Sequence, residues 1–503
     1  MTQNYFPRWK VKTEGTIAPD ETLPLGQTLA MGIQHVVIMF GSTVLAPLIM
    51  GLDPNVAIFM SGVGTLLFFL IVGGRVPSYL GSSFAFIGVV IAATGYAGTG
   101  PNPNIPIAMG GVIACGVVYA IVGLIVMWTG VGWIERLMPP VVTGAIVMTI
   151  GLNLAPVAVK GMGATNFEQW YAAAAVLIMG FVAVYLRGFL QKLLILVGIV
   201  IAYILYWLLT NVMALGKPID FQPLINASWV GVPNFSAPVF QPEAMILIVP
   251  VVVILIAENL GHIKAVNVMT HRNLDPYIGR SFFGDGLATI LAGFVGGPGV
   301  TTYGENIGVM AATRVYSTLI FPVAGCFAIM LSFSPKFGAL IQTIPGPLLG
   351  AVSVIVFGIA LTDAITTDCF LRDFQLTYAT LFSGVRHDSG DPVEWGEKMI
   401  AHYRKLGIDP AGKTLLFSDS LDFARAHELY EHFRNRTKVA FGIGTYISND
   451  TEVPALNIVM KTTLCNGMDV AKISDTPGKG MCKNPDYVHY LKRCIDWRMN
   501  HDR

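Results

Sequence analysis

The chain has 503 residues, of which 53% are hydrophobic and only 13% are charged, and its formal net charge is +1. A soluble protein of this length would carry about 25% charged residues, so the composition indicates a membrane protein. The balanced charge excludes a strongly basic surface for nucleic acid and a strongly acidic surface for cations.

The N-terminal segment, residues 1–26, is polar and has no apolar core of the kind found in a secretion signal. A membrane-spanning helix needs about 20 apolar residues. By that rule, residues 27–360 contain twelve candidate spans. Their centres lie near residues 38, 64, 87, 118, 146, 178, 201, 251, 287, 309, 325 and 352.

The third and tenth spans are interrupted by residues that weaken helices. They read PSYLGSSFAFIGVV and GGPGVTTYGENIGVM, and they supply polar atoms at membrane depth. Irregular backbone is tolerated there where it lines an enclosed cavity, and matched interrupted helices in two repeats indicate a transporter's binding site. The alternative is a pair of glycine-mediated packing interfaces.

Ionisable side chains in these spans are candidate functional residues, because each costs at least about 2.5–3.5 kcal/mol to insert. Glu258 lies in LIAENLGH, four residues before His262 and on the same helical face. This pair suits proton handling, because histidine titrates near neutral pH. Glu305 follows Gly304, and a carboxylate that accepts from paired N–H groups suits a cyclic imide such as a pyrimidine. The alternative for Glu258 is a helix-end carboxylate exposed to cytoplasmic water.

Two polar residues of the first span, Gln34 and His35, are candidates for polar contacts inside the bundle. For His35 alone, the expectation is a satisfied buried histidine rather than a ligand. Asp285 is expected at a helix interface.

Lys and Arg are unequally distributed between alternate loops, which predicts the orientation of the spans. With the N-terminus in the cytoplasm, eleven of these residues fall inside and only Lys160, Lys217 and Lys336 fall outside. Because twelve is an even number, this arrangement places residues 361–503 in the cytoplasm as well.

Several segments of residues 1–360 resemble the nucleobase–cation symporter family 2, also called the nucleobase–ascorbate transporters, and especially its bacterial pyrimidine and uracil permeases. The segments are QHVVIMFGSTVLAP, VPSYLGSSFAFIGVV, RLMPPVVTGAIV, LIAENLGH and TTYGENIGVMAATRVYST. The last contains Asn306, Gly308, Thr313 and Arg314 of the family signature. The resemblance implies a fold of fourteen spans in two inverted repeats of seven. It ends after the twelfth span, so the last two spans of the family have no counterpart.

The resemblance also implies the site. Glu258 and Glu305 would hold the base, the backbone at Phe84 and Gly304 would line the pocket, and His262 with Glu258 would couple the proton. Transport would use a proton gradient, with no cofactor and no metal. The expected partners are a small-molecule nucleobase and the lipid bilayer of a bacterial inner membrane, with a homodimer as an alternative to a monomer and no nucleic acid.

Residues 361–503 carry 18 of the 32 Lys and Arg residues and are composed for water. Short apolar runs (TLLF, VAFGIG, LNIVMK) alternate with amphipathic stretches at 392–406 and 421–434, which predicts βα units. The turn at Gly442, Gly444 and Thr445 is a candidate phosphate cradle. A second candidate set lies in RHDSGD and consists of Arg386, Asp388, Ser389 and Asp391. These residues suit a phosphorylated sugar or a metal, or alternatively form a salt-bridged turn.

The motifs RHDSGD, FSDSLD and FGIGT resemble the C-terminal third of nicotinate phosphoribosyltransferase, an α/β-barrel enzyme. The resemblance implies a phosphoribosyl-binding face and, for an active enzyme, phosphoribosyl pyrophosphate and ATP. It also implies that the N-terminal domain, the first barrel strands and the activating histidine of that family are missing.

The sequence therefore predicts a polytopic α-helical membrane domain, about twelve spans of a fourteen-span inverted-repeat fold, fused to an incomplete soluble α/β fragment. Three functions are weighed: proton-coupled transport of a pyrimidine such as uracil, a membrane-tethered nicotinate phosphoribosyltransferase, and a chimeric product in which neither activity is complete. The transporter ranks first because its proposed binding residues are retained.

Overall fold

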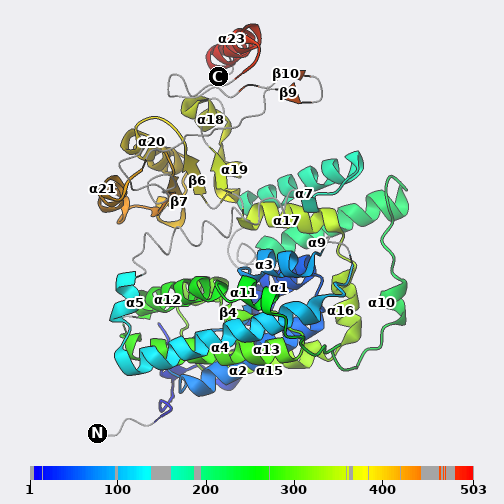
Figure 1. Cartoon of the computed structure of the whole chain (residues 1–503), viewed down its shortest axis with the longest axis vertical. Coiled ribbons are helices and arrows are strands. Elements are labelled where there is room, and N and C mark those ends of the chain that lie inside the picture. Colours follow the sequence, from blue (N-terminus) through cyan, green and yellow to red (C-terminus); the bar gives the residue numbers. More distant parts are fainter. Residues whose placement is uncertain are drawn as a thin grey trace. The chain divides into compact units, whose positions relative to one another are not determined.

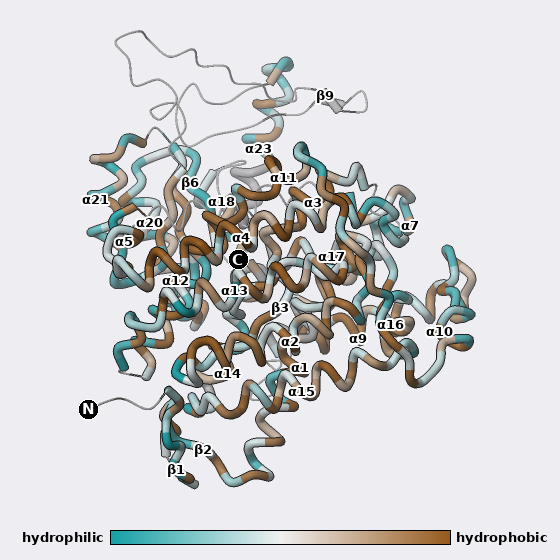
Figure 2. The backbone as a smooth tube through the Cα atoms, turned by 60° about the horizontal axis from the view of Figure 1, so that its bottom comes forward, coloured by the Kyte–Doolittle hydropathy of each residue, from teal (hydrophilic) through white to brown (hydrophobic). Residues whose placement is uncertain are grey.

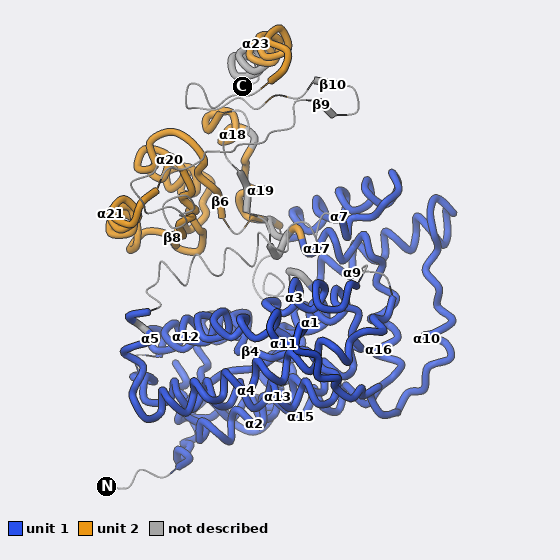
Figure 3. Tube along the Cα trace, in the orientation of Figure 1, with its two compact units in different colours: residues 1–139, 152–182, 186–353 blue, residues 140–151, 183–185, 354–503 orange. Residues whose placement is uncertain are grey.

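The computed structural model describes residues 5–13, 15–96, 100–137, 160–185, 194–270, 272–357, 359–361, 366–382, 384–419, 421–442, 464–465, 468–469, 471 and 482–501. The chain divides into two compact units (Figure 3). The first contains residues 1–139, 152–182 and 186–353, and the second contains residues 140–151, 183–185 and 354–503.

Helices dominate the described part of residues 1–357, and Figure 1 labels them in chain order. The elements are β1 (Lys10–Val11), β2 (Glu21–Thr22), α1 (Leu25–Met50), α2 (Pro54–Ile71), β3 (Leu80–Ser82), α3 (Phe86–Thr94), α4 (Ile105–Thr129), α5 (Gly132–Leu137), α7 (Asn166–Tyr185), α9 (Leu194–Trp207), the π-helix η1 (Leu208–Val212), α10 (Gln222–Asn226), α11 (Pro242–Ile248), α12 (Val251–Thr270), the 3₁₀-helix η2 (Asp275–Tyr277), α13 (Ile278–Phe294), β4 (Val300–Thr302), α14 (Gly304–Thr313), α15 (Ile320–Ser332), α16 (Pro335–Gln342) and α17 (Gly346–Phe357).

The described helices include four that are long and apolar enough to cross a membrane, or five if the bent pair α15 and α16 forms one span. The four are residues 25–50, 54–71, 105–129 and 242–270. Figure 2 shows the apolar colour running along these helices. The predicted spans near residues 87 and 309 consist of the short helices α3 and α14, each next to a strand, because Gly, Ser, Thr and Pro interrupt them. The predicted span near residue 146 lies outside the described residues.

The two interrupted spans meet at a short antiparallel ladder. Strand β3 pairs with β4, with Gly81 opposite Thr301, and each strand is followed by a short helix, α3 or α14. Neighbouring helices satisfy the first backbone N–H of each strand, as a membrane interior requires. Leu80 donates to Thr65 Oγ1 of α2 at 2.9 Å, and Val300 donates to Thr289 Oγ1 of α13 at 3.3 Å.

Helices α4 and α13 pack closely because glycines face each other across their interface. A Cβ atom added at Gly123 would lie 2.4 Å from the backbone nitrogen of Phe283, and one added at Gly286 would lie 2.5 Å from that of Ala120. Small residues at such interfaces let membrane helices approach closely. This contact holds α13, and with it the start of β4, against the rest of the bundle.

We expect Gly286→Ala to destabilise the protein by about 1–3 kcal/mol, because the new methyl group must displace backbone of α4. Gly261→Ala on α12 is the matched control, since nothing lies within 4 Å of a Cβ atom there. Thermal unfolding of the purified chain in detergent would measure both variants. Equal unfolding temperatures for the two variants would contradict this account of the interface.

The second unit contains a parallel sheet in the strand order β5-β6-β7-β8. Its elements are β5 (Ile359–Leu361), α18 (Thr367–Asp373), α19 (Leu376–Leu381), β6 (Gly384–His387), α20 (Pro392–Lys405), the 3₁₀-helix η3 (Pro410–Gly412), β7 (Thr414–Phe417), α21 (Phe423–Phe433), β8 (Lys438–Phe441), β9 (Leu464–Cys465), β10 (Met468–Asp469) and α23 (Pro485–His501). The βα alternation predicted at 392–441 is confirmed.

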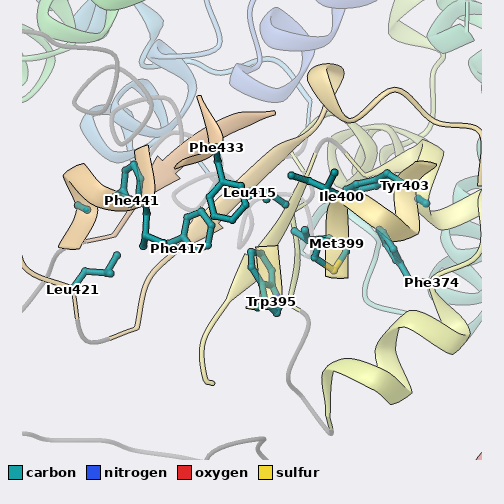
Figure 4. Packing of buried hydrophobic residues seen from close by; sticks show 14 residues of the cluster. Phe374, Trp395, Met399, Ile400, Tyr403, Leu415, Phe417, Leu421, Phe433 and Phe441 are labelled. Atoms are coloured by element: carbon teal, nitrogen blue, oxygen red, sulfur yellow. The ribbon is translucent and has the colours of Figure 1, made fainter. Parts of the chain in front are cut away.

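An aromatic core holds this sheet to its helices (Figure 4). Trp395 of α20 and Phe433 of α21 lie against Phe417 of β7, with ring centroids 5.3 Å and 5.5 Å apart. All three side chains are buried. Burial of such large rings contributes much of the free energy of a small core, so this part of the second unit has a hydrophobic core of its own.

An ion-pair cluster links α20 to the end of α21. Both carboxylate oxygens of Glu397 accept from Arg436, each at 2.6 Å, and Oε1 also pairs with His432. The hydrogen bonds from Arg436 lower the pKa of Glu397 to about 2. Because the folded pKa is lowered, the cluster stabilises the fold above the ordinary carboxyl range and loses that contribution as the pH falls toward 2. The three side chains are 32–43% exposed, so water screens the pair and the contribution is modest.

Candidate functional site

Two carboxylates from different helices lie beside the β3–β4 ladder. Glu258 is on α12, and the hydroxyl of Ser83, which follows β3, donates to its Oε2 at 3.5 Å. Glu305 is in the first turn of α14, and the hydroxyl of Ser42 on α1 donates to its Oε1. An acidic residue is favourable at that position because the N-terminal end of a helix is partially positive. The two carboxylates flank the ladder, because Ser83 directly follows β3 and Glu305 is three residues after the end of β4.

His262 connects α12 to the second interrupted span. Its Nδ1 lies 2.8 Å from Thr302 Oγ1 at the end of β4. The other ring nitrogen, Nε2, lies 3.2 Å from where a Cβ atom at Gly304 would be. The absence of a side chain at Gly304 therefore lets the imidazole approach the start of α14. The structure thus brings Glu258, His262, Gly304 and Glu305 into one region.

Phe84 lies just before α3, at the end of the first interrupted strand. The preceding residue, Ser83, donates its backbone N–H to Gly299 at 2.9 Å, and the Phe84 carbonyl accepts from Ile87 at 3.1 Å. Phe84 lies between β3 and α3, and Gly304 is the first residue of α14 after β4, so each lies near the start of a helix that follows a strand of the ladder. Backbone N–H groups at such helix starts suit the binding of carbonyl oxygens and anions.

The two polar residues of the first span, His35 and Gln34, differ in burial. His35 is fully buried, and its Nδ1 lies 2.8 Å from the side-chain nitrogen of Asn306, which also donates to the His35 carbonyl at 3.3 Å. This contact links α1 to α14 behind Glu305. His35 is buried as expected but only partly satisfied, because its Nε2 has no hydrogen-bond partner among the residues that the structure describes. Gln34 is half-buried on α1.

Sequence reasoning missed the hydroxyl groups that hold the carboxylates, including Ser42 and Ser83. The only sequence signal for them is their place in the small polar segments GSTV and GSS. A second buried contact joins α12 to α13, where Asn259 donates to Asp285 Oδ2 at 2.6 Å. This contact agrees with the expected position of Asp285 at a helix interface.

In the second unit, the candidate phosphoribosyl residues lie at the carboxyl ends of parallel strands. Asp388 and Ser389 directly follow β6, and Gly442 follows β8, where its N–H donates to Phe417 at 2.7 Å. Arg386 Nε donates to Ser418 Oγ at 2.9 Å and its Nη2 pairs with Asp388 at 3.4 Å. Gly444 and Thr445 lie outside the described residues.

Asp391 has a structural role at the start of α20. Its Oδ1 accepts from the backbone N–H groups of Val393 at 3.0 Å and Glu394 at 2.8 Å, as an N-cap residue does. Its Oδ2 lies 3.7 Å from Arg425. These contacts favour the alternative of a salt-bridged turn over a carboxylate that is available to bind a phosphorylated sugar or a metal. No cluster of three or more metal-ligating side chains occurs among the residues that the structure describes.

Comparison with known proteins also divides the chain into two parts, which match different families. A family model described as "Permease family" matches residues 26–367, and a model of the nicotinate phosphoribosyltransferase family matches residues 351–497. The two matches overlap between residues 351 and 367.

Two curated relatives match the first part. The Escherichia coli protein named as a pyrimidine permease, RutG, is 63% identical over 358 residues, covering 70% of this chain and 81% of the relative. The Escherichia coli uracil permease is 40% identical over 361 residues, covering 69% and 80%.

Two solved structures are also similar. The transmembrane domain of the cyanobacterial bicarbonate transporter BicA aligns with a TM-score of 0.52 at 15% identity, over 71% of this chain and 94% of that domain. This likeness shows a transporter fold. Nicotinate phosphoribosyltransferase from Vibrio cholerae is 50% identical over 27% of this chain, with a TM-score of 0.27. The aligned part is 35% of that enzyme's length.

Proposed function

This chain belongs to the permease family, and from that premise we propose that it binds a pyrimidine nucleobase such as uracil and carries it across a bacterial inner membrane. The observation that carries the proposal is the meeting of two carboxylates, Glu258 and Glu305, beside the two helix starts that follow β3 and β4. Carboxylates accept hydrogen bonds from the ring N–H groups of a pyrimidine. Backbone N–H groups near Phe84 and Gly304 would donate to its carbonyl groups.

We propose that His262 and Glu258 together couple transport to the movement of a proton. They lie four residues apart on α12, and His262 also contacts Thr302 of the ladder. A proton that binds near this pair would change the charge next to the substrate and the interactions that hold β4. Transport would then be driven by the proton gradient with no bound cofactor.

We also propose the family architecture of fourteen spans in two inverted repeats, of which this chain would retain about twelve. The matched ladder supports it. In each half, a threonine one helix earlier accepts the N–H of the first strand residue, Thr65 for Leu80 and Thr289 for Val300. The proposed division is residues 1–26, 27–360 and 361–503. Strand β5, at Ile359–Leu361, crosses the second of these boundaries.

We expect both termini to lie in the cytoplasm, because most loop Lys and Arg residues would then face inward. Protease added to inverted vesicles should cleave residues 361–503, whereas the same protease added to right-side-out vesicles should leave them intact. Cleavage only in right-side-out vesicles would contradict the orientation.

Equilibrium binding of radiolabelled uracil to the purified full chain tests the proposed function directly. Saturable binding that unlabelled uracil displaces and adenine does not displace is expected, because adenine lacks the imide edge. Absence of saturable binding would overturn the proposal. Uptake into proteoliposomes should be weak or absent, because the permease match ends at residue 367 and a different family match follows.

The second candidate function belongs to residues 361–503, which we call the tail. The nicotinate phosphoribosyltransferase match over residues 351–497 favours descent from that enzyme. The overlap of the two matches at residues 351–367 is also what a chimeric join of two genes would leave. Sequencing the locus across codons 340–380 from independent DNA would test the join.

A further inference from the structure

Helix α1 contributes two consecutive hydroxyl groups to the start of α14. Ser42 donates to Glu305 Oε1, and Thr43 Oγ1 donates to the hydroxyl of Tyr303 at 3.1 Å. Ser42 is 3% exposed and Thr43 is fully buried, so water does not compete strongly for these bonds. Helix α1 therefore holds α14 at two points, one on each side of Gly304.

The second of these contacts fixes the backbone from which Glu305 projects. The Tyr303 hydroxyl donates to the carbonyl of Ser82 at 3.0 Å, and Ser82 Oγ donates to the carbonyl of Thr43 at 3.3 Å. The Tyr303 ring lies so close to Gly81 that a Cβ atom there would be 2.4 Å away. With α1, β3 and the start of α14 joined in this way, the main freedom left to Glu305 is rotation of its side chain.

The hydrogen bond from Ser42 restricts that rotation. A carboxylate offers about four lone-pair positions, so a bond from Ser42 to Oε1 leaves Oε2 able to accept from a ligand. Glu258 is held differently, because the donor distance from Ser83 is 3.5 Å, at the long limit for a hydrogen bond. Of the two carboxylates, Glu305 is therefore the one that the protein orients before a ligand arrives.

We propose that Ser42 is a positioning residue for substrate binding, whose hydroxyl orients Glu305 so that Oε2 meets an N–H group of the pyrimidine. This inference rests on the proposed function, because it needs a ligand that donates to Glu305. Orientation of the carboxylate in advance removes part of the entropy cost of binding, which increases affinity without adding a contact to the ligand.

A double-mutant cycle with radiolabelled uracil tests the role of Ser42. The purified full-length parent, Ser42→Ala, Glu305→Gln and the double variant are compared by equilibrium binding, together with their thermal unfolding. We expect Ser42→Ala to weaken uracil binding roughly five- to tenfold, which is less than the loss of a direct charge-assisted contact, because Glu305 itself remains available to the ligand. In the Glu305→Gln background, Ser42→Ala should change the affinity less than about twofold, since the charged acceptor is already gone.

Ser332→Ala is the matched control, because Ser332 is a buried serine on α15 whose hydroxyl donates to the carbonyl of Ile329. It should bind uracil like the parent. Equal affinities of the parent and Ser42→Ala would overturn the inference. It would also be overturned if Ser42→Ala lowered the affinity by the same factor in the parent and in Glu305→Gln, because that result indicates a general structural effect. A parent chain that binds no uracil would overturn the proposed function, and the role of Ser42 with it.

Discussion

Replacement of Glu305 by Gln should weaken uracil binding at least about tenfold. Glutamine keeps the size of the side chain but has one oxygen that accepts instead of two, and it carries no charge. Loss of one charge-assisted contact costs roughly 1.5–3 kcal/mol, and about 1.4 kcal/mol corresponds to a factor of ten in affinity. Glu258→Gln should have an effect of similar size. Radiolabelled uracil binding to the purified variants is the measurement.

The control for both variants is Glu243→Gln, which removes a carboxylate from the exposed first turn of α11. It should leave the affinity for uracil unchanged. Each variant must elute as a monodisperse species and unfold at a temperature close to that of the parent. If Glu305→Gln passes that check and binds uracil as tightly as the parent, the assignment of Glu305 to the substrate is wrong.

The ionisable members of the candidate site could be picked out from sequence because they stand out against the apolar spans. Glu258, His262 and Glu305 are each conspicuous in their own segment, and the structure places all three beside the β3–β4 ladder. The hydroxyl partners could not be found in this way. Ser42 and Glu305 are 263 positions apart, and serine is common in membrane helices that carry no function.

The helices of the fold could be predicted from sequence, but the pairing of its short strands could not. The apolar runs indicated the long helices, and the Gly, Pro and Thr content of the third and tenth spans indicated that these spans are interrupted. The antiparallel pairing of β3 with β4 was not predicted, because each strand has only three residues and their pairing is decided by tertiary contacts.

In the tail, the predicted strand TLLF and the predicted helix at 392–406 correspond closely to β7 and α20. Local pattern is sufficient there because each strand alternates with an amphipathic helix. The predicted strand LNIVMK lies outside the described residues. The role of Asp391 as a helix cap was also missed, although Asp before Pro at a helix start is a recognised capping signal.

Geometry at the strand ends raises the question of whether the tail retains enzyme activity. Asp388 follows β6, Ser418 follows β7 and Gly442 follows β8, so all three lie at the carboxyl edge of one parallel sheet. In α/β barrels, active sites form at this edge from loops of about eight strands. The described sheet has four strands, with β5 and β8 at its edges.

We expect the chain to form no nicotinate mononucleotide from nicotinate, phosphoribosyl pyrophosphate and ATP. Catalysis requires that the base and the phosphoribosyl donor be held together in one geometry, and a misplacement of about 1 Å can cost a hundredfold in rate. Residues before position 351 match a permease instead, so the groups that would complete the barrel do not precede the sheet.

The assay uses the purified full chain from cells that lack the intact enzyme, and its control is the Asp388→Ala, Asp391→Ala double variant. Turnover above that control would show that the strand ends of β6 to β8 suffice for catalysis, and the enzyme would then have to be restored as a function of this chain.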